Sequence, residues 1–144
     1  MKVEFRIDPA ADAPYAVIYA PSRTAQVDQI MHRLAEPRVM HAYDDRGETL
    51  IEADEIIRIY TENRRVMLES TAGVYQLRRR LYELEERLDT CEFIRISNSE
   101  IVARRWIRGL DFSLTGTIRL TLKNGVCCYV SRRYVSRIRK AFEE

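Results

Sequence analysis

Residues 92–102 read Glu-Phe-Ile-Arg-Ile-Ser-Asn-Ser-Glu-Ile-Val, an alternation of apolar and polar residues that changes abruptly to Ser, Asn and Glu. Residues 129–135, Tyr-Val-Ser-Arg-Arg-Tyr-Val, end another apolar run directly on paired arginines. Alternation with a period of two is typical of a half-buried β-strand. Both segments are therefore places where a rigid β scaffold is expected to present exposed polar side chains.

The polar residues after these two strands are expected to begin helices. Residues 97–100 (Ser-Asn-Ser-Glu) have the spacing of a capping box, which predicts a short helix with Asn98 and Ser99 in its first turn. Ser131 is expected to cap a last helix that ends near Phe142.

A hairpin is expected between the two segments, because Asn124-Gly125 separates two alternating runs. A two-residue loop would place Leu122 opposite Cys127 and Leu120 opposite Tyr129. This register predicts that Cys127 is a small core residue and not a reactive thiol.

The rest of the chain has the pattern of short strands joined by turns, with two further helices. Alternation at 3–7 and an apolar run at 15–19 predict two strands, and apolar residues at helical spacing predict a helix from about 23 to 36. A second helix is expected around residues 77–88. The other expected strands lie at 39–43, 49–53, 56–60, 65–69, 74–76, 93–96, 110–114 and 117–122.

Composition excludes several classes of protein. No run of about 18 apolar residues exists, so no membrane span is expected, and residues 1–7 have the pattern of a strand and not of a signal peptide. The three cysteines, Cys91, Cys127 and Cys128, form neither a disulfide framework nor a metal-binding motif. A reducing, cytoplasmic location and the absence of a metal site are expected.

Charge is distributed unevenly along the chain. Residues 1–75 carry 9 Lys and Arg against 13 Asp and Glu, and residues 76–144 carry 15 against 9, so that balances of −4 and +6 make up the net charge of +2. A basic half favours a polyanionic partner. Asymmetry of this size is also common in soluble domains, and charge alone does not decide between the two interpretations.

No catalytic constellation is found in the sequence. It contains no phosphate loop, no glycine-rich dinucleotide turn and no Cys/His or Ser/His pair at a suggestive spacing. Neither an enzyme, a cofactor nor a small-molecule substrate is expected. Arginines at strand and helix ends, with Asn and Ser nearby, suit binding instead, because Arg pairs with guanine, Asn with adenine, and hydroxyl groups hold phosphates.

From about Ala53 onward the sequence resembles the LytTR-type DNA-binding domain of bacterial transcription regulators. The resemblance depends on the order and spacing of four stretches and not on any one of them. These stretches are 54–60 (Asp-Glu-Ile-Ile-Arg-Ile-Tyr), 81–88 (Leu-Tyr-Glu-Leu-Glu-Glu-Arg-Leu), 93–102 and 129–135.

The resemblance implies the fold class and the mode of binding. The expected fold is mostly β (α+β), with small antiparallel sheets and short helices, and an N-terminal strand–strand–helix extension precedes it. Such domains place loops, not a recognition helix, in successive major grooves of double-stranded DNA, and two copies typically bind paired direct repeats in a promoter. The residues that the resemblance places at the DNA are Asn63, Arg64, Arg65, Ser97, Asn98, Ser99, Ser131, Arg132 and Arg133. Arg104 and Arg105 are further DNA-binding candidates because of their basic character.

Three loops, led by Arg64, Asn98 and Arg133, are therefore expected to converge on one edge. One departure from the family pattern bears on this site. Many members have Asn after the apolar pair that Ile101-Val102 matches, and this chain has Ala103.

The domain division that follows is an extension at 1–45 and a LytTR-like domain at 46–144. A phosphoacceptor receiver domain needs about 120 residues, so the preceding segment is too short to be one. Control by a partner is expected instead, with a homodimer on DNA and a membrane-protein regulator as the candidate partners, or the extension acts as a dimerising or sensing cap.

Two other functions fit parts of the pattern. A basic β-rich half is compatible with an RNA-binding domain, although RNA readers usually display aromatic stacking platforms. Tyr60, Tyr75, Tyr129 and Tyr134 are the candidates, and alternation places most of them on core faces. A protein-interaction module, in which the arginines form ion pairs, is the other alternative.

Overall fold

The computed structural model describes residues 1–35 and 38–142, and the chain divides into two compact units, Met1–Pro37 and Arg38–Glu144. The second unit includes the strand at Val39–Asp44, which the sequence had placed in the extension. The boundary expected at residue 45 stays a prediction. Each unit is described below by itself.

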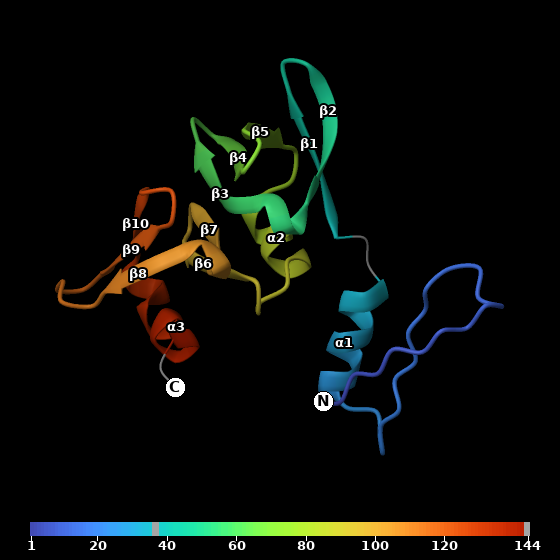
Figure 1. Cartoon of the computed structure of the whole chain (residues 1–144). Helices are drawn as coiled ribbons and strands as arrows, with labels where there is room; N and C mark the ends of the chain where they lie inside the picture. The colour runs from blue at the N-terminus through green and yellow to red at the C-terminus, as the bar shows by residue number, and fades with distance from the viewer. Residues whose placement is uncertain (36–37, 143–144) are drawn as a thin grey trace. The chain divides into compact units, whose positions relative to one another are not determined.

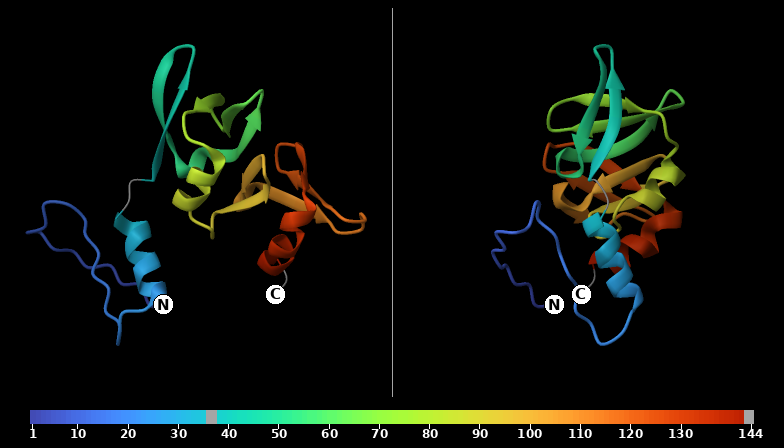
Figure 2. Two further views of the ribbon diagram at one scale, coloured as in Figure 1. Left: turned by 180° about the vertical axis from the view of Figure 1, so that it is seen from behind. Right: turned by 90° about the vertical axis from the view of Figure 1, so that its right-hand side faces the viewer.

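The first unit contains one helix, and the two strands expected in it are wrong. Residues 1–24 form neither helix nor strand, as both views of Figure 2 show. A strand needs a neighbouring edge that accepts its backbone hydrogen bonds, and this unit provides none for 3–7 or 15–19. The predicted helix is confirmed as α1 (Ala25–Ala35). Thr24 precedes it and accepts a hydrogen bond from the backbone N–H of Val27 at 3.3 Å.

The second unit is built on a seven-stranded antiparallel sheet with the order β2-β1-β5-β4-β3-β7-β6 (Figure 1). A three-stranded sheet, β10-β9-β8, lies at the β6 end. The elements are β1 (Val39–Asp44), β2 (Gly47–Glu52), β3 (Ile56–Glu62), β4 (Arg65–Ser70), β5 (Val74–Leu77), α2 (Leu81–Arg87), β6 (Phe93–Ser97), β7 (Glu100–Ala103), β8 (Ile107–Asp111), β9 (Ile118–Leu122), β10 (Cys127–Val130) and α3 (Arg132–Phe142), with short 3-10 turns at Ala53–Glu55 and Arg104–Trp106. A strand-rich α+β fold is confirmed for this unit.

Two hydrophobic cores lie on opposite faces of the β3-β7-β6 strands, because successive strand residues point to opposite faces. On β7, Ile101 belongs to the core that includes Leu81 and Leu84 of α2. The next residue, Val102, belongs to the core that includes β9, β10 and Ile138 of α3. The central strands are thus fixed from both sides, which gives the turns at their ends a rigid base.

The short helix expected at residue 97 is wrong, because residues 93–103 form the β6–β7 hairpin. A capping box needs the acidic side chain to turn back to the start of its own helix. The Glu100 carboxylate instead accepts a hydrogen bond from Arg58 on the neighbouring strand at 3.0 Å. Ser97 Oγ accepts from the N–H of Ser99 at 3.2 Å, which closes a tight turn.

The register expected for the β9–β10 hairpin is also wrong by one residue. Cys127 lies opposite Thr121 and Cys128 opposite Leu120. The N–H of Leu122 donates to the carbonyl of Val126 at 2.9 Å, so the loop has three residues, and Gly125, with φ +88°, takes the left-handed position of a bulge. Consequently Cys128 is the core residue and Cys127 is exposed.

This register predicts the reactivity of the thiols. Burial and the neighbouring Glu100 carboxylate raise the pKa of Cys128 to about 12, so at pH 8 its thiol is protonated as well as buried. Cys91 and Cys127 are exposed. Mass spectrometry after treatment with N-ethylmaleimide should therefore find adducts at Cys91 and Cys127, and at Cys128 only after unfolding. Rapid modification of Cys128 with protection of Cys127 would contradict the observed register.

Candidate nucleic-acid interface

Three polar segments of the second unit meet at one end of its sheets. The backbone N–H of Thr61, beside the β3–β4 turn, donates to the carbonyl of Ser99 in the β6–β7 turn at 2.9 Å. The N–H of Ser131, between β10 and α3, donates to the carbonyl of Ile96 at 2.9 Å. The structure therefore brings together the β3–β4 turn with Arg64, the β6–β7 turn with Asn98 and the first helical turn of α3 with Arg133, which we call the three turns.

In the β3–β4 turn, Arg64 has a backbone conformation that is unfavourable for most residues other than glycine. Asn63 and Arg64 both have positive φ, 51° and 65°, in a two-residue loop between Glu62 and Arg65. Such loops prefer Asn-Gly, because a side chain at the second position costs about 1 kcal/mol. Arg64 is exposed and makes no hydrogen bond or ion pair with another described residue. Local strain that holds an unpartnered guanidinium group at the tip of a turn indicates a functional position.

The β6–β7 turn is held by its neighbours on both sides. Arg95 donates to the carbonyls of Ser97 at 2.9 Å and Asn98 at 2.9 Å. The Tyr134 hydroxyl donates to Asn98 Oδ1 at 3.2 Å, which orients the amide. Asn98 itself is exposed, and its Nδ2 has no partner among the described residues. The turn is therefore rigid, and the Nδ2 group of Asn98 can still donate hydrogen bonds to a partner.

The start of α3 adds two more exposed arginines. Tyr134 and Ile138 anchor the helix in the second core, so its N-terminal end is fixed against β6. Neither Arg132 nor Arg133 pairs with a carboxylate of the described chain, although Arg132 packs against the Gly116 backbone. Cationic side chains that remain unpaired in a protein with 22 acidic residues are available for an anionic partner.

Arg104 and Arg105 lie elsewhere and bind backbone carbonyls of their own chain. Arg104 donates to the carbonyl of Ala141 at 3.0 Å and lies 4.9 Å from the centre of the Phe142 ring. Arg105 donates to the carbonyl of Ala53 at 2.8 Å. Both guanidinium groups therefore join elements of the fold. Ala103 is fully buried beside them, in the core that faces α2.

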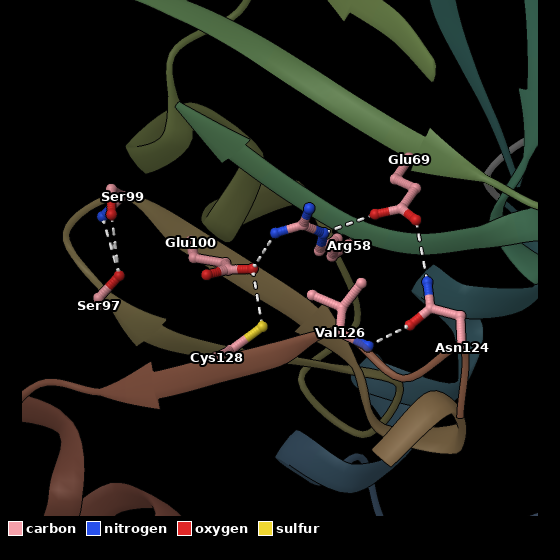
Figure 3. Close-up of polar contacts among 8 residues, drawn as sticks. All are labelled: Arg58, Glu69, Ser97, Ser99, Glu100, Asn124, Val126 and Cys128. Atoms are coloured by element: carbon pink, nitrogen blue, oxygen red, sulfur yellow. Dashed lines mark hydrogen bonds and ion pairs between the residues drawn. The ribbon is translucent and has the colours of Figure 1, made fainter. Parts of the chain in front are cut away.

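A half-buried polar cluster supports the end of the sheets that carries the three turns (Figure 3). Arg58 on β3 donates to Glu69 on β4 at 2.6 Å and to Glu100 on β7 at 3.0 Å. Cys128 Sγ donates to the same Glu100 at 3.2 Å, and Asn124 Nδ2 donates to Glu69 at 2.9 Å. Figure 3 shows the Ser97–Ser99 turn and Asn124 on opposite sides of this cluster, which we call the Arg58 cluster.

The charges of the Arg58 cluster join three strands of the seven-stranded sheet, and the hydrogen bonds from Cys128 and Asn124 connect the cluster to the β9–β10 hairpin of the three-stranded sheet. Burial by itself would lower the pKa of Arg58, but the hydrogen bonds and charges of Glu69 and Glu100 outweigh it and raise the pKa above its usual value. The guanidinium group is thus permanently charged and is held by two carboxylates. The sequence had not indicated Arg58 and Glu100 as members of one cluster, although Arg58 lies on the strand before the Arg64 turn and Glu100 directly follows the Asn98 turn.

A second ion cluster holds α2 against α3. Glu85 accepts hydrogen bonds from Arg95 at 2.6 Å and Arg137 at 2.8 Å. Burial would raise the pKa of Glu85, but these two arginines lower it below its usual value. Arg95 and Tyr134, the two residues that hold the Asn98 turn, were missed at the sequence level. The partner of Tyr134 is 36 residues away, and Arg95 donates to backbone carbonyls, which no sequence pattern marks.

The described residues offer no other chemistry at this end. Residues 1–35 and 38–142 contain no group of three or more His, Cys, Asp or Glu side chains that could hold a metal ion. None of the helices in that part of the chain is long and apolar enough to cross a membrane.

The second unit is similar in sequence to a family of DNA-binding domains and similar in structure to one of its solved members. The model of the LytTr DNA-binding domain family matches residues 47–143. The solved LytTr DNA-binding domain of a Bacillus cereus protein, described as a methyl-accepting/DNA response regulator, superimposes with a TM-score of 0.72 at 21% identity, covering 76% of this chain and 100% of that one. The arrangement of sheets is therefore shared.

Relatives match over nearly the whole chain. Uncharacterized HTH-type transcriptional regulators of Staphylococcus aureus strains MSSA476 and NCTC 8325 are each 32% identical over 143 residues, or 97% of both chains. The similarity therefore extends into the first unit. In this chain, the two helices of the second unit are separated by the five strands β6 to β10. Together they do not form a helix-turn-helix unit.

Proposed function

The chain belongs to the LytTR family of DNA-binding domains, and from that premise we propose that it is a DNA-binding transcription regulator that reads its site through the three converging turns. The observation that carries the proposal is the end of the sheets where Arg64, Asn98 and Arg133 are exposed and held by rigid neighbours. Arginine and asparagine are the side chains that read guanine and adenine edges in the major groove.

Each turn has a distinct role in this proposal. Arg64, Asn98 and Arg133 contact bases, and the hydroxyl and cationic groups beside them contact phosphates. The phosphate contacts are assigned to Ser97, Ser99, Ser131 and Arg132. Asn63 and Arg65 flank the Arg64 tip, and Arg65 lies opposite Glu62 across the turn, which offsets part of its charge. Arg104 and Arg105 act by fixing the fold and not by contacting DNA.

We further propose that two copies bind a pair of direct repeats, since one end of a small domain spans only part of a typical recognition site. Control by a partner, a membrane protein among the candidates, remains a prediction from the sequence. The exposed aromatic platform of an RNA reader finds less support. Tyr129 is exposed, but Tyr134 is buried and the Arg58 guanidinium group lies 4.1 Å from the centre of the Tyr60 ring.

Selection of bound duplexes from a random pool tests the proposal. At a fixed, moderate salt concentration we expect a recurrent motif, occurring as two copies at constant spacing, because base contacts and not phosphate contacts carry sequence information. Recovery of unrelated sequences would contradict the proposed function. Equal affinity for duplex DNA and single-stranded RNA would favour the RNA-binding alternative.

A further inference from the structure

The first eight residues carry apolar side chains that the described structure leaves in solvent. Val3, Phe5 and Ile7 are 82%, 88% and 81% exposed. Single exposed apolar residues are normal, but three in strict alternation form one face of an extended segment. Glu4 forms ion pairs with Lys2 at 2.8 Å and Arg6 at 3.2 Å, so the charged side chains share the other face.

The segment has one pairing in which both faces match a second copy of itself. Antiparallel pairing about Phe5 places Val3 opposite Ile7 and Phe5 opposite the same residue of the other copy. On the other face it places Lys2 opposite Asp8 and Glu4 opposite Arg6. Cross-strand pairs of opposite charge and of apolar side chains stabilise a sheet, whereas like charges destabilise it.

Other registers fail the same test. Pairing centred on Glu4 sets Glu4 against Glu4 and Lys2 against Arg6, and pairing centred on Arg6 sets Arg6 against itself. Shifts by one residue place apolar residues opposite charged ones. Parallel pairing in register aligns each charge with itself. Pro9, which lacks an N–H donor, follows Asp8 and ends the segment at the length that the matching register uses.

We propose that residues 2–8 form an antiparallel strand pair with a second copy of this chain. The pairing supplies the neighbouring strand edge that this segment lacks within its own unit, so residues 2–8 form a strand only in the dimer. A two-stranded ribbon is marginal by itself in water. Helix α1 of the same unit offers the exposed side chains Met31 and Leu34 to cover the joined apolar face. The proposal does not depend on DNA binding by the second unit.

Sedimentation analysis of the full-length chain without DNA tests the pairing, using charge reversals. Glu4→Arg and Arg6→Glu should each weaken dimerisation about tenfold, because every reversal turns two attractive pairs per dimer into repulsive ones. The combined E4R/R6E variant restores opposite charges in the same register and should regain the wild-type dissociation constant. Asp12→Arg makes the same charge change as Glu4→Arg, but outside the paired segment, and should leave that constant unchanged.

Each contrary outcome overturns the proposal. A wild-type chain that stays monomeric up to about 100 µM excludes it. A dimer unaffected by E4R or R6E, or one that the charge swap does not restore, excludes this register. Equal weakening by Asp12→Arg would assign the effect to net charge. Protection of residues 2–8 from hydrogen exchange in a monomer would show that these residues dock on their own chain instead.

Discussion

Replacing Arg58 by methionine is expected to lower the free energy of unfolding by about 3 kcal/mol, because two half-buried carboxylates lose their shared cation. The Arg58, Glu69 and Glu100 side chains are 20%, 20% and 15% exposed, so solvent screens the remaining charges only in part. Methionine keeps most of the aliphatic volume, which limits the contribution of a cavity. Urea unfolding followed by circular dichroism gives the free energy directly.

A variant without any of the three charges serves as the matched control for this prediction. Arg58→Met combined with Glu69→Gln and Glu100→Gln leaves no uncompensated carboxylate, and the amide oxygen introduced by Glu69→Gln can still accept from Asn124. This triple variant should recover more than half of the stability that Arg58→Met loses. A loss below about 0.5 kcal/mol for Arg58→Met, the size of a surface effect, would show that the charges of the Arg58 cluster do not stabilise the fold.

Replacing the leading residue of each of the three turns is expected to weaken specific DNA binding and leave the fold intact. Arg64→Gly, Asn98→Ala and Arg133→Ala should each weaken binding to the selected duplex about tenfold to a hundredfold, the range for loss of one base contact. Glycine is chosen at position 64 because it accepts the φ of 65° without strain, so this change should maintain or raise stability. Fluorescence anisotropy at constant salt measures the affinities.

A control with the same change in charge separates this effect from general electrostatics. Arg46 and Lys123 are exposed in two other turns, and Lys123 neighbours Asn124, on the opposite side of the Arg58 cluster from Ser97 and Ser99. The double variant Arg46→Ala/Lys123→Ala removes two positive charges, as many as the double variant Arg64→Gly/Arg133→Ala removes. We expect the control pair to lower affinity less than about threefold. Equal losses in both pairs would mean that net charge, and not the turns, carries the binding.

The sequence predicted the β3–β4 hairpin, because two apolar runs flank a polar turn. It missed β7, where Ile101, Val102 and Ala103 are all buried. The failures at residues 3–7 and 97–102 share one physical cause, which is that the structure formed there depends on a partner outside the local sequence. The spacing of Ser97 and Glu100 favoured a helix, but Glu100 pairs with Arg58, 42 residues earlier. Alternation at 3–7 is real, yet no strand forms without an edge to pair with.

The candidate site could be predicted as three separate turns but not as one surface. Family resemblance supplied Arg64, Asn98 and Arg133 by position. Their convergence depends on the Thr61–Ser99 and Ser131–Ile96 backbone hydrogen bonds, which join strands far apart in sequence. The same limit applies to Arg104 and Arg105, because their basic character suggested DNA, whereas the carbonyls of Ala141 and Ala53 receive their hydrogen bonds.

The central claim is that the end of the sheets formed by the three turns contacts DNA. Amide chemical shifts of the nitrogen-15-labelled chain, recorded with and without the selected duplex, test it residue by residue. The account predicts large shifts at 61–65, 97–99 and 131–134 and small ones at 123–126, in the turn on the other side of the Arg58 cluster. Large shifts confined to 123–126, with the three turns unchanged, would contradict it.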